Sequence, residues 1–175
     1  MHQLMSIFGK DRAGLVAGMT RLLYEHRANL GDLEMTRLGG IFALLVEFQL
    51  PKEQVKKLER AIKNFARDED LKINLVDASP YEDSTTNIPP NTIISIYGAD
   101  RPGIVCRVTE LLAERDINIS NLETNLDDRD NLYLMILEAQ KPDNFSLSVL
   151  DNKLQQIAKE LGISIKVRPL DPPRL

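Results

Sequence analysis

The sequence has few of the residues from which metal centres and disulfide scaffolds are built. Its 175 residues include one cysteine, Cys106, two histidines and no tryptophan. A single cysteine forms no intrachain disulfide, and together with two histidines it gives a structural zinc site too few ligands. No apolar run approaches the roughly 20 residues that span a bilayer, and the N-terminus lacks the pattern of a signal peptide. These absences predict a reduced, cytoplasmic protein without a metal, a cofactor or a membrane segment.

An excess of positive charge is also absent. The chain has 22 Lys and Arg residues against 26 Asp and Glu residues, which gives a formal net charge of -4 at pH 7. Proteins that bind nucleic acid draw most of their affinity from clustered Lys and Arg. The sequence therefore predicts no direct contact with nucleic acid.

What the sequence does contain is an internal repeat. The segment 5–37 recurs as 94–126, and shorter matches continue to the end of each copy. Between the copies lie Pro80, Pro89, Pro90 and a polar run, which is the composition of a linker. The repeat predicts domains at residues 1–78 and 92–169, a linker at 79–91 and a C-terminal tail at 170–175.

Both copies predict the same order of elements. Branched apolar residues predict first strands at 4–8 and 92–97, ended by Gly9 and Gly98, and helical spacing follows at 15–23 and 104–112. Gly39-Gly40 suits a hairpin turn, and Gly162 suits the end of a helix. The remaining elements are paired strands at 30–38 with 41–50 and 119–126 with 132–140, second helices around 55–66 and 147–158, and last strands at 71–76 and 163–167.

This order, βαββαβ, occurs twice and predicts an α+β fold. Its simplest form is two ferredoxin-like units, each a four-stranded antiparallel sheet with two helices on one face. The third strands, at 41–46 and 132–137, are apolar without a break, whereas a strand with one wet face alternates. We therefore expect the other copy or a second chain to cover the open face of each sheet, which predicts a paired tandem and a homo-oligomer.

The closest identity lies in the turn between the first strand and the first helix. It reads Gly9-Lys10-Asp11-Arg12-Ala13-Gly14 in one copy and Gly98-Ala99-Asp100-Arg101-Pro102-Gly103 in the other. A glycine-rich turn before a helix exposes unpaired N–H groups and the positive end of the helix dipole, which favour a carboxylate or a phosphate. The alternative is structural, with Asp11 and Asp100 capping the helix. Pro102 suits a first helical turn.

Two asparagines, Asn29 and Asn118, begin the second strand of each copy. We expect the start of that strand to lie close to the first turn. An asparagine there offers a donor and an acceptor to a small zwitterion, while the aspartate of the turn accepts from its ammonium group. The alternative is a turn residue with a local backbone bond.

The two turns and the βαββαβ order together resemble the ACT domain. The resemblance rests on the Asp-Arg-Pro-Gly-Ile sequence from Asp100 and the Asp-Ile-Asn-Ile sequence around Asn118, and it covers nearly the whole chain, twice. It is greatest for stand-alone tandem ACT regulators of the glycine cleavage repressor type. The family binds amino acids between paired ACT units, at the first turn and the start of the second strand. By this resemblance the ligand-binding residues are Gly98, Asp100, Arg101, Pro102, Gly103 and Asn118, with Gly9, Asp11, Arg12, Gly14 and Asn29 in the first copy.

The sequence departs from the family pattern at two places. Ala13 stands where proline is usual, and Gly9 and Gly98 stand where some amino-acid-binding members have a side chain that contacts the ligand. These departures favour a ligand site in the second copy.

Other candidate sites are weaker. Asp127, Asp128 and Asp130 lack the spacing of a calcium loop and are expected to form a solvated hairpin tip. Cys106 replaces an alanine of the first copy and is expected to be a small packing residue, and His26 is expected at the surface near a helix end. No Ser-His-Asp or Cys-His arrangement converges on the glycine turns, so no enzyme is predicted.

The resemblance to the ACT domain implies a regulatory protein of amino-acid metabolism. The resemblance implies a small amino acid as ligand, with glycine the first to try, and a protein partner such as a transcription activator. One alternative is a dimerising scaffold with empty sites. Another is a relative of enzymes that carry ACT domains, which the lack of a catalytic domain within 175 residues counts against.

Overall fold

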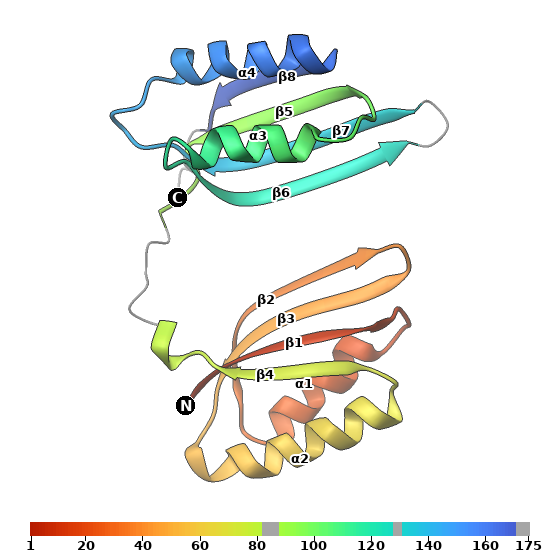
Figure 1. Ribbon diagram of the computed structural model, residues 1–175. Helices are drawn as coiled ribbons and strands as arrows, with labels where there is room; N and C mark the ends of the chain where they lie inside the picture. The colour runs from red at the N-terminus through yellow and green to blue at the C-terminus, as the bar shows by residue number, and fades with distance from the viewer. Residues whose placement is uncertain (82–87, 128–130, 171–175) are drawn as a thin grey trace. The chain divides into compact units, whose positions relative to one another are not determined.

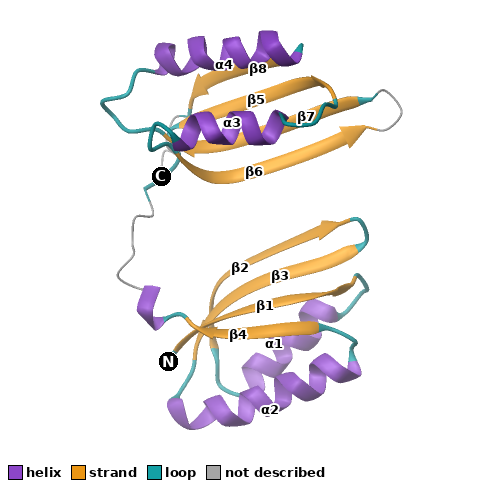
Figure 2. Cartoon of the chain, viewed as in Figure 1, coloured by secondary structure: helices purple, strands orange, loops and turns teal. Residues whose placement is uncertain are grey.

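A computed structural model describes residues 1–81, 88–127 and 131–170 (Figures 1 and 2). The chain divides into two compact units, Met1–Thr85 and Thr86–Leu175. The first unit contains β1 (His2–Lys10), α1 (Leu15–Glu25), β2 (Asn29–Leu38), β3 (Ile41–Gln49), α2 (Lys52–Asp68), β4 (Lys72–Asp77) and a short 3-10 helix (Ser79–Tyr81). The second contains β5 (Thr92–Ala99), α3 (Ile104–Ala113), β6 (Asn118–Asp127), β7 (Leu132–Gln140), α4 (Leu147–Leu161) and β8 (Ser164–Pro169).

Each unit is a four-stranded antiparallel sheet with two helices on one face. The strand orders are β2-β3-β1-β4 and β6-β7-β5-β8, and all neighbouring strands run antiparallel. Figure 2 shows both helices of each unit on the same side of its sheet. The predicted α+β fold of two ferredoxin-like units is therefore confirmed. The predicted domain and linker boundaries stay predictions.

The helices lie on the sheets through apolar residues at helical spacing. In α1 the buried residues are Leu15, Met19 and Leu23, which fall on one side of the helix because they are four positions apart. They form one core with alternate residues of the central strands, such as Met5 and Ile7 of β1. Alternate residues point to opposite faces of a strand, so each central strand gives one face to this core.

The first strands do not end at the glycines, which corrects the prediction. Gly9 and Gly98 lie within β1 and β5 and pair with residues of β3 and β7. A Cβ atom at Gly98 would lie 2.8 Å from Cγ2 and 3.1 Å from Cα of Ile163. Glycine therefore continues the strand here because the chain entering β8 passes too close for a side chain.

The helices α1 and α3 begin after Gly14 and Gly103, three residues beyond Asp11 and Asp100. Gly14 and Gly103 are the N-terminal cap residues of α1 and α3, with φ of 93° and 94°, and no side chain caps either helix. The hypothesis that Asp11 and Asp100 cap the helices is therefore wrong. Pro102 lies before the cap rather than in the first helical turn, because a left-handed glycine cannot continue a right-handed helix.

Two glycine predictions are confirmed. Gly39 and Gly40 have φ of 57° and 81° and form the two-residue turn between β2 and β3. Gly162 has φ of 63° and ends α4 in the left-handed conformation.

The open face of each sheet is apolar. Along β3, Phe42 and Leu44 point to the helices, whereas Ile41 and Leu45 point to the open face and are 56% and 45% exposed. In the second unit Leu132 of β7 is 45% exposed. The unbroken apolar run of β3 therefore places apolar side chains on both faces of the strand, one toward the helices and one toward the open face. That another sheet covers the open face stays a prediction.

Candidate functional site

In the first unit, contacts within the protein occupy the charged side chains of the turn. The Asp11 N–H donates to the Gly40 carbonyl at 3.2 Å, and the Asp11 carboxylate accepts from Arg37 Nη1 at 3.2 Å. Arg12 donates to the Glu69 carbonyl at 2.7 Å and forms an ion pair with the Glu69 carboxylate. Because Glu69 is the C-terminal cap of α2, Arg12 joins this turn to the negative end of a helix.

In the second unit, Asp100 and Arg101 correspond to Asp11 and Arg12 but do not form the matching ion pairs with described residues. Within the described part of the chain the Asp100 carboxylate makes no hydrogen bond or ion pair, and Leu126 stands where the repeat places Arg37 in the first unit. The Arg101 guanidinium lies against Gly162, where a Cβ atom would be 3.5 Å from Cζ. Among the residues that the structure describes, the Asp100 carboxylate thus has no partner that matches Arg37 of the first unit.

Tyr133 of β7 lies near this turn, a residue that the sequence analysis did not single out. It is buried, pairs with Gly98 of β5 and places its hydroxyl 3.6 Å from the sulfur of Met135, to which it donates. Burial, and secondly the negative charge of Asp100, raise the pKa of Tyr133. The repeat holds a signal for it, because Gly9 likewise pairs with an aromatic residue, Phe42.

The helix that follows the turn presents unpaired donors. The first helical bond of α3 runs from the Arg107 N–H to the Gly103 carbonyl at 2.9 Å. The N–H groups of Ile104, Val105 and Cys106 precede this bond, and no side chain caps them. Donors and helix dipole at this end favour an anionic group.

The predicted meeting of asparagine and turn within one unit is wrong. Asn29 pairs with Gln49, which also pairs with His2 at the start of β1. The turn begins after Lys10 at the other end of β1, which at the rise of a strand is about 25 Å away. Because β1 and β2 are both antiparallel to β3 they run parallel, so their starts share one end of the sheet. Asn118 is separated from its turn in the same way.

The weaker candidates also have places in the structure. Cys106 is exposed rather than packed, and its thiol donates to Glu110 Oε1 at 3.2 Å. The expectation of a packing residue is wrong because this position lies on the outer side of α3. His26 lies at the end of α1, as expected, with Nδ1 2.8 Å from the Leu22 carbonyl.

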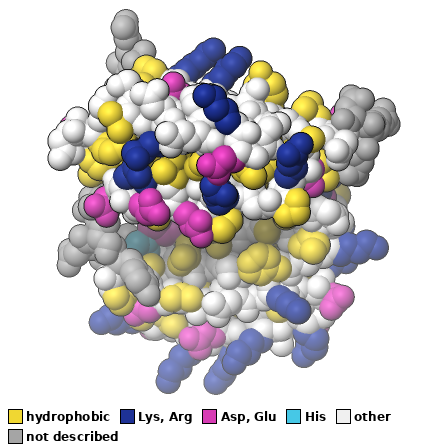
Figure 3. Space-filling model, turned by 45° about the horizontal axis from the view of Figure 1, so that its top comes forward, with side chains coloured by type: hydrophobic (Ala, Val, Ile, Leu, Met, Phe, Trp, Pro, Cys, Tyr) yellow, Lys and Arg dark blue, Asp and Glu magenta, His cyan; other side chains and the backbone are white. Residues whose placement is uncertain are grey.

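The hairpin tip can be described only in part, since Asp128 and Asp130 lie outside the described residues. Among residues 1–81, 88–127 and 131–170, no group of three or more His, Cys, Asp and Glu side chains is placed to hold a metal ion. No helix in those ranges is long and apolar enough to cross a membrane. On the face shown in Figure 3, side chains of both charges are interspersed with hydrophobic ones.

Comparison with protein families identifies both units. The ACT domain model named ACT_6 matches residues 2–76, and the ACT domain model named ACT matches residues 92–161. The chain belongs to the ACT-domain family. It is a tandem of two ACT domains, as the resemblance in its sequence implied.

Its curated relatives are shorter than this tandem. A UPF0237 protein of Methanosarcina acetivorans is 32% identical over 80 residues, which are 45% of this chain and 85% of the relative. A UPF0237 protein of Neisseria meningitidis serogroup B is 32% identical over 78 residues, 45% of this chain and 86% of the relative. A single ACT domain thus accounts for most of each relative.

Two solved structures align with both ACT domains together. A protein with a provisional assignment as glycine cleavage system transcriptional repressor has a TM-score of 0.73 and 18% identity, covering 98% of both chains. An unknown protein from Galdieria sulphuraria has a TM-score of 0.77 and 26% identity, covering 97% of this chain and 98% of its own. At 18% identity the first comparison shows the fold alone.

Proposed function

We propose that this tandem ACT protein is a non-enzymatic regulator of amino-acid metabolism that binds a small amino acid through its second domain and passes its occupancy to a protein partner. ACT domains in both halves support a regulatory, amino-acid-binding role. The observation that carries the choice of domain is the Asp100 carboxylate, which has no partner among the described residues and precedes the uncapped start of α3. In the first domain the matching Asp11 is held by Arg37.

The ligand contacts follow from the charges at this turn. The α-ammonium group of the amino acid donates to Asp100, and its α-carboxylate accepts from the N–H groups at the start of α3. A Cβ atom at Gly103 would meet nothing within 4 Å, so the backbone is open to solvent there. Arg101 and Pro102 shape the turn, and glycine is the first candidate ligand, as the resemblance to the glycine cleavage repressor type implies.

Asn118 contributes from a different ACT sheet. β2 and β6 are edge strands of their sheets, and two edge strands placed antiparallel bring the start of one beside the end of the other. Such a pairing would bring the asparagine of one unit to the turn of another, which no single unit achieves. The proposed site therefore lies at the seam between two ACT sheets, and we propose that the second sheet comes from another copy of the chain, which makes the protein a homo-oligomer.

The mechanism is linkage between binding and assembly. A ligand that binds only the paired state stabilises it by about 2.7 kcal/mol at a hundredfold excess over Kd. This is enough to bias a marginal assembly and so to change what a partner recognises. As that partner we propose a transcription activator, which is what the resemblance of the sequence to tandem ACT regulators of the glycine cleavage repressor type implies. The single cysteine supports a cytoplasmic location.

Thermal unfolding against a panel of single amino acids tests the proposal. We expect a concentration-dependent rise in Tm with one small amino acid, lost in Asp100→Asn and Asn118→Ala. Asp11→Asn is the matched control, because Arg37 already occupies that carboxylate, and it should keep the full ligand shift. Equal loss in Asp11→Asn and Asp100→Asn would contradict the choice of the second domain.

The second candidate function is a dimerising scaffold without ligand. The exposed apolar residues on the open sheet faces favour it, because surfaces of this kind mark places where proteins associate. If no amino acid shifts Tm while the protein still self-associates in sedimentation, the scaffold replaces the sensor.

A further inference from the structure

The second ACT domain has an apolar strip along the middle of its open face. The strip lies on the two central strands, β5 and β7, and includes Tyr97, Leu132 and Leu134, which are 42%, 45% and 39% exposed. Ile136 lies on the same face and is half-buried. Contiguous apolar side chains of this size on a surface mark places where proteins associate. The strip is therefore a candidate association surface.

One row of residues across this sheet has opposite charges at its two edges. The row runs from β6 to β8 and consists of Glu123, Ile136, Ser95 and Lys166. Directly paired residues point to the same face, and the two neighbours of Ser95 in β5 are buried on the helix side, so the row lies on the open face. Within the described residues, the single polar contact of Glu123 comes from Asn121 Nδ2 at 3.5 Å.

Lys166 is directed to the open face because its strand is anchored from the other side. Gln155 Nε2 of α4 donates to the Ile165 carbonyl at 2.8 Å, which ties β8 to the helix. Ile165 belongs to the core, so the next residue, Lys166, points the opposite way. Its Nζ lies 5.7 Å from the centre of the Tyr97 ring. Among the residues that the structure describes, no carboxylate pairs with this ammonium group.

We propose that the open face of the second ACT sheet packs on the same face of a second copy of the chain, about a twofold axis parallel to the strands. Packed sheets lie about 10 Å apart with their strands nearly aligned. This axis places β6 of one copy over β8 of the other at the same row, so Glu123 of each copy meets Lys166 of the other. An axis across the strands would instead place β6 over β6, with like charges at each edge.

A second row supports the same axis. It consists of Asn121, Glu138, Ile93 and Arg168, from β6 to β8. Glu138 is half-buried on the central strand β7, and covering the face would remove its carboxylate from water. A carboxylate taken from water needs a cation beside it. In the proposed packing Arg168 of the other copy lies over β6, one strand from Glu138, and supplies that cation.

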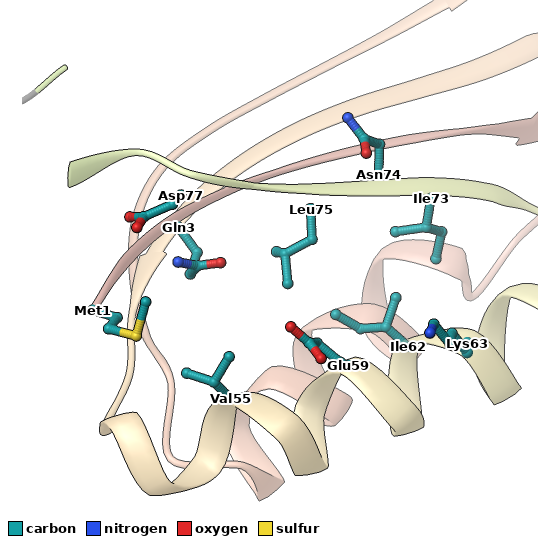
Figure 4. A pocket seen from close by; sticks show the side chains of 10 residues that line it. All are labelled: Met1, Gln3, Val55, Glu59, Ile62, Lys63, Ile73, Asn74, Leu75 and Asp77. Carbon is teal, nitrogen blue, oxygen red and sulfur yellow. The ribbon is translucent and has the colours of Figure 1, made fainter. Parts of the chain in front are cut away.

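The first ACT sheet lacks this match of charges. Its corresponding row, from β2 to β4, consists of Glu34, Leu45, Ser6 and Asn74. Figure 4 shows Asn74 directed away from α2, opposite to its two apolar neighbours in β4, so an amide lies on the open face where the second sheet has Lys166. Lys72 lies two residues away, in a row that ends in Thr36. If the first sheet covered the second, Glu123 would face an amide, so the charges favour a second copy.

The two parts of this surface have different roles. The apolar strip contributes the affinity, because its side chains are removed from water. The charges at the rim fix which face and which orientation are accepted, because like charges brought together cost several kcal/mol. Both copies use the same residues, as a twofold interface requires. The backbone groups along the edge of β6 are not used, so the pairing of edges proposed for the amino-acid site is compatible with it.

Sedimentation of the full-length protein, without added amino acid, tests the inference by exchanging charges between copies. Glu123→Lys alone and Lys166→Glu alone should each self-associate at least about tenfold more weakly than wild type, because each brings like charges together. An equimolar mixture of the two variants should associate as wild type does, because the introduced lysine then meets the introduced glutamate. Labelling one variant at Cys106, which is exposed on the helix side, follows the mixed species.

Glu34→Lys is the matched control. It makes the same change in the corresponding row of the first sheet and should leave this association unchanged. Urea unfolding of each variant checks that it is folded, as the exposure of Glu123 and Lys166 leads us to expect. Asp100→Asn should self-associate as wild type does, so this interface and the amino-acid site fail or succeed separately.

Four results would overturn the inference. They are a wild type that stays monomeric, single variants that associate as tightly as wild type, a mixture that associates as weakly as the single variants, and equal weakening by Glu34→Lys and Glu123→Lys. The third would arise if the partner of Glu123 lay within the same chain, since mixing copies cannot then restore it. The fourth would indicate that the first sheet covers the second.

Discussion

At Gly98 the packing of the protein, without any ligand, explains why the residue is glycine. It lies within β5, and the space where its side chain would be is occupied by Ile163. Gly9 has the same relation to Leu71, whose Cδ2 would lie 2.3 Å from an added Cβ. The resemblance assigns both glycines to the ligand site, yet the close approach of Leu71 and Ile163 already explains them.

Gly98→Ala is expected to destabilise the protein by about 1–3 kcal/mol, the usual effect of overpacking. The contact involves backbone as well as side-chain atoms of Ile163, so local rotation of a side chain does not relieve it. Urea unfolding measures the change. Gly31→Ala is the matched control, because an added Cβ there meets only ordinary contacts from 3.5 Å outward. A stability loss in Gly31→Ala as large as that in Gly98→Ala would contradict the explanation.

Tyr133 connects the charge of Asp100 to stability at high pH. Its pKa is raised in the folded protein, so the folded state holds the phenolic proton more tightly than the unfolded state. The resulting stability is fully present below the unfolded pKa of about 10 and is lost as the pH rises through the folded pKa.

We therefore expect wild type to lose more stability than Tyr133→Phe between pH 9 and pH 11, measured by urea unfolding. Asp100→Asn should show a smaller loss than wild type, since it removes the second cause of the shift. The same loss in Tyr133→Phe as in wild type would show that other groups cause the pH dependence.

At the scale of the element, α3 carries a thiol whose reactivity is set by its own helix. Cys106 and Glu110 are one helical turn apart, and the thiol donates to the carboxylate. This hydrogen bond, and secondly the negative charge of Glu110, raise the pKa of Cys106. Because the thiolate is the nucleophile, the exposed cysteine is expected to react slowly at neutral pH.

Glu110→Gln is expected to speed the reaction of Cys106 with an aromatic disulfide reagent at pH 7.5 by about two- to tenfold, since a lower pKa increases the thiolate fraction. Glu114→Gln is the control on the next turn of the helix, where the carboxylate pairs with Arg115 instead. It should leave the rate unchanged. A rate in Glu110→Gln equal to wild type would mean that the carboxylate does not set the reactivity.

At the scale of the whole molecule, the open sheet faces are where association is expected. Phe8, Ile41 and Leu45 are apolar side chains on the open face of the first sheet, each partly exposed. Apolar area removed from water contributes about 25 cal/mol per Å², so a second sheet laid on this face would be stabilised.

Leu45→Asp tests that expectation. If a second chain covers the face, sedimentation should show weaker self-association at equal protein concentration. If the other ACT domain of the same chain covers it, the free energy of unfolding should fall by about 1–3 kcal/mol instead. Asn64→Asp on the exposed side of α2 is the control and should change neither quantity. No effect of Leu45→Asp on either would contradict a covered face.

The fold could be predicted from the sequence because its signals are local and occur twice. Apolar spacing located the eight strands and four α-helices of the described residues, though not the 3-10 helix Ser79–Tyr81, and the pair Gly39-Gly40 located a turn, since these signals depend on neighbouring residues. The ends of elements were less predictable at Gly98, where a residue distant in the sequence fixes the backbone. Cys106 was misjudged for a related reason, because which side of a helix meets the core depends on the sheet beneath it.

The sequence selected candidate residues for the site but could not give their geometry. The repeated turn drew attention to Asp100 and Asn118, which pattern alone could select. The two residues lie at opposite ends of the sheet because β5 and β6 run parallel on either side of β7, with Asp100 after the end of β5 and Asn118 at the start of β6. This follows from the topology and not from the sequence pattern. Tyr133 was missed because its importance comes from a cross-strand neighbour.

The sequence by itself determined the tandem of two ACT domains, their elements and the turns most alike between them, because repetition and periodicity are properties of the chain alone. Only the tertiary structure decided which of two similar turns has its charges paired with described residues, and which of two similar helices is joined to its edge strand by a side chain. Those differences depend on contacts such as Arg37 with Asp11 and Gln155 with Ile165, whose partners meet only once the sheet and helices are assembled.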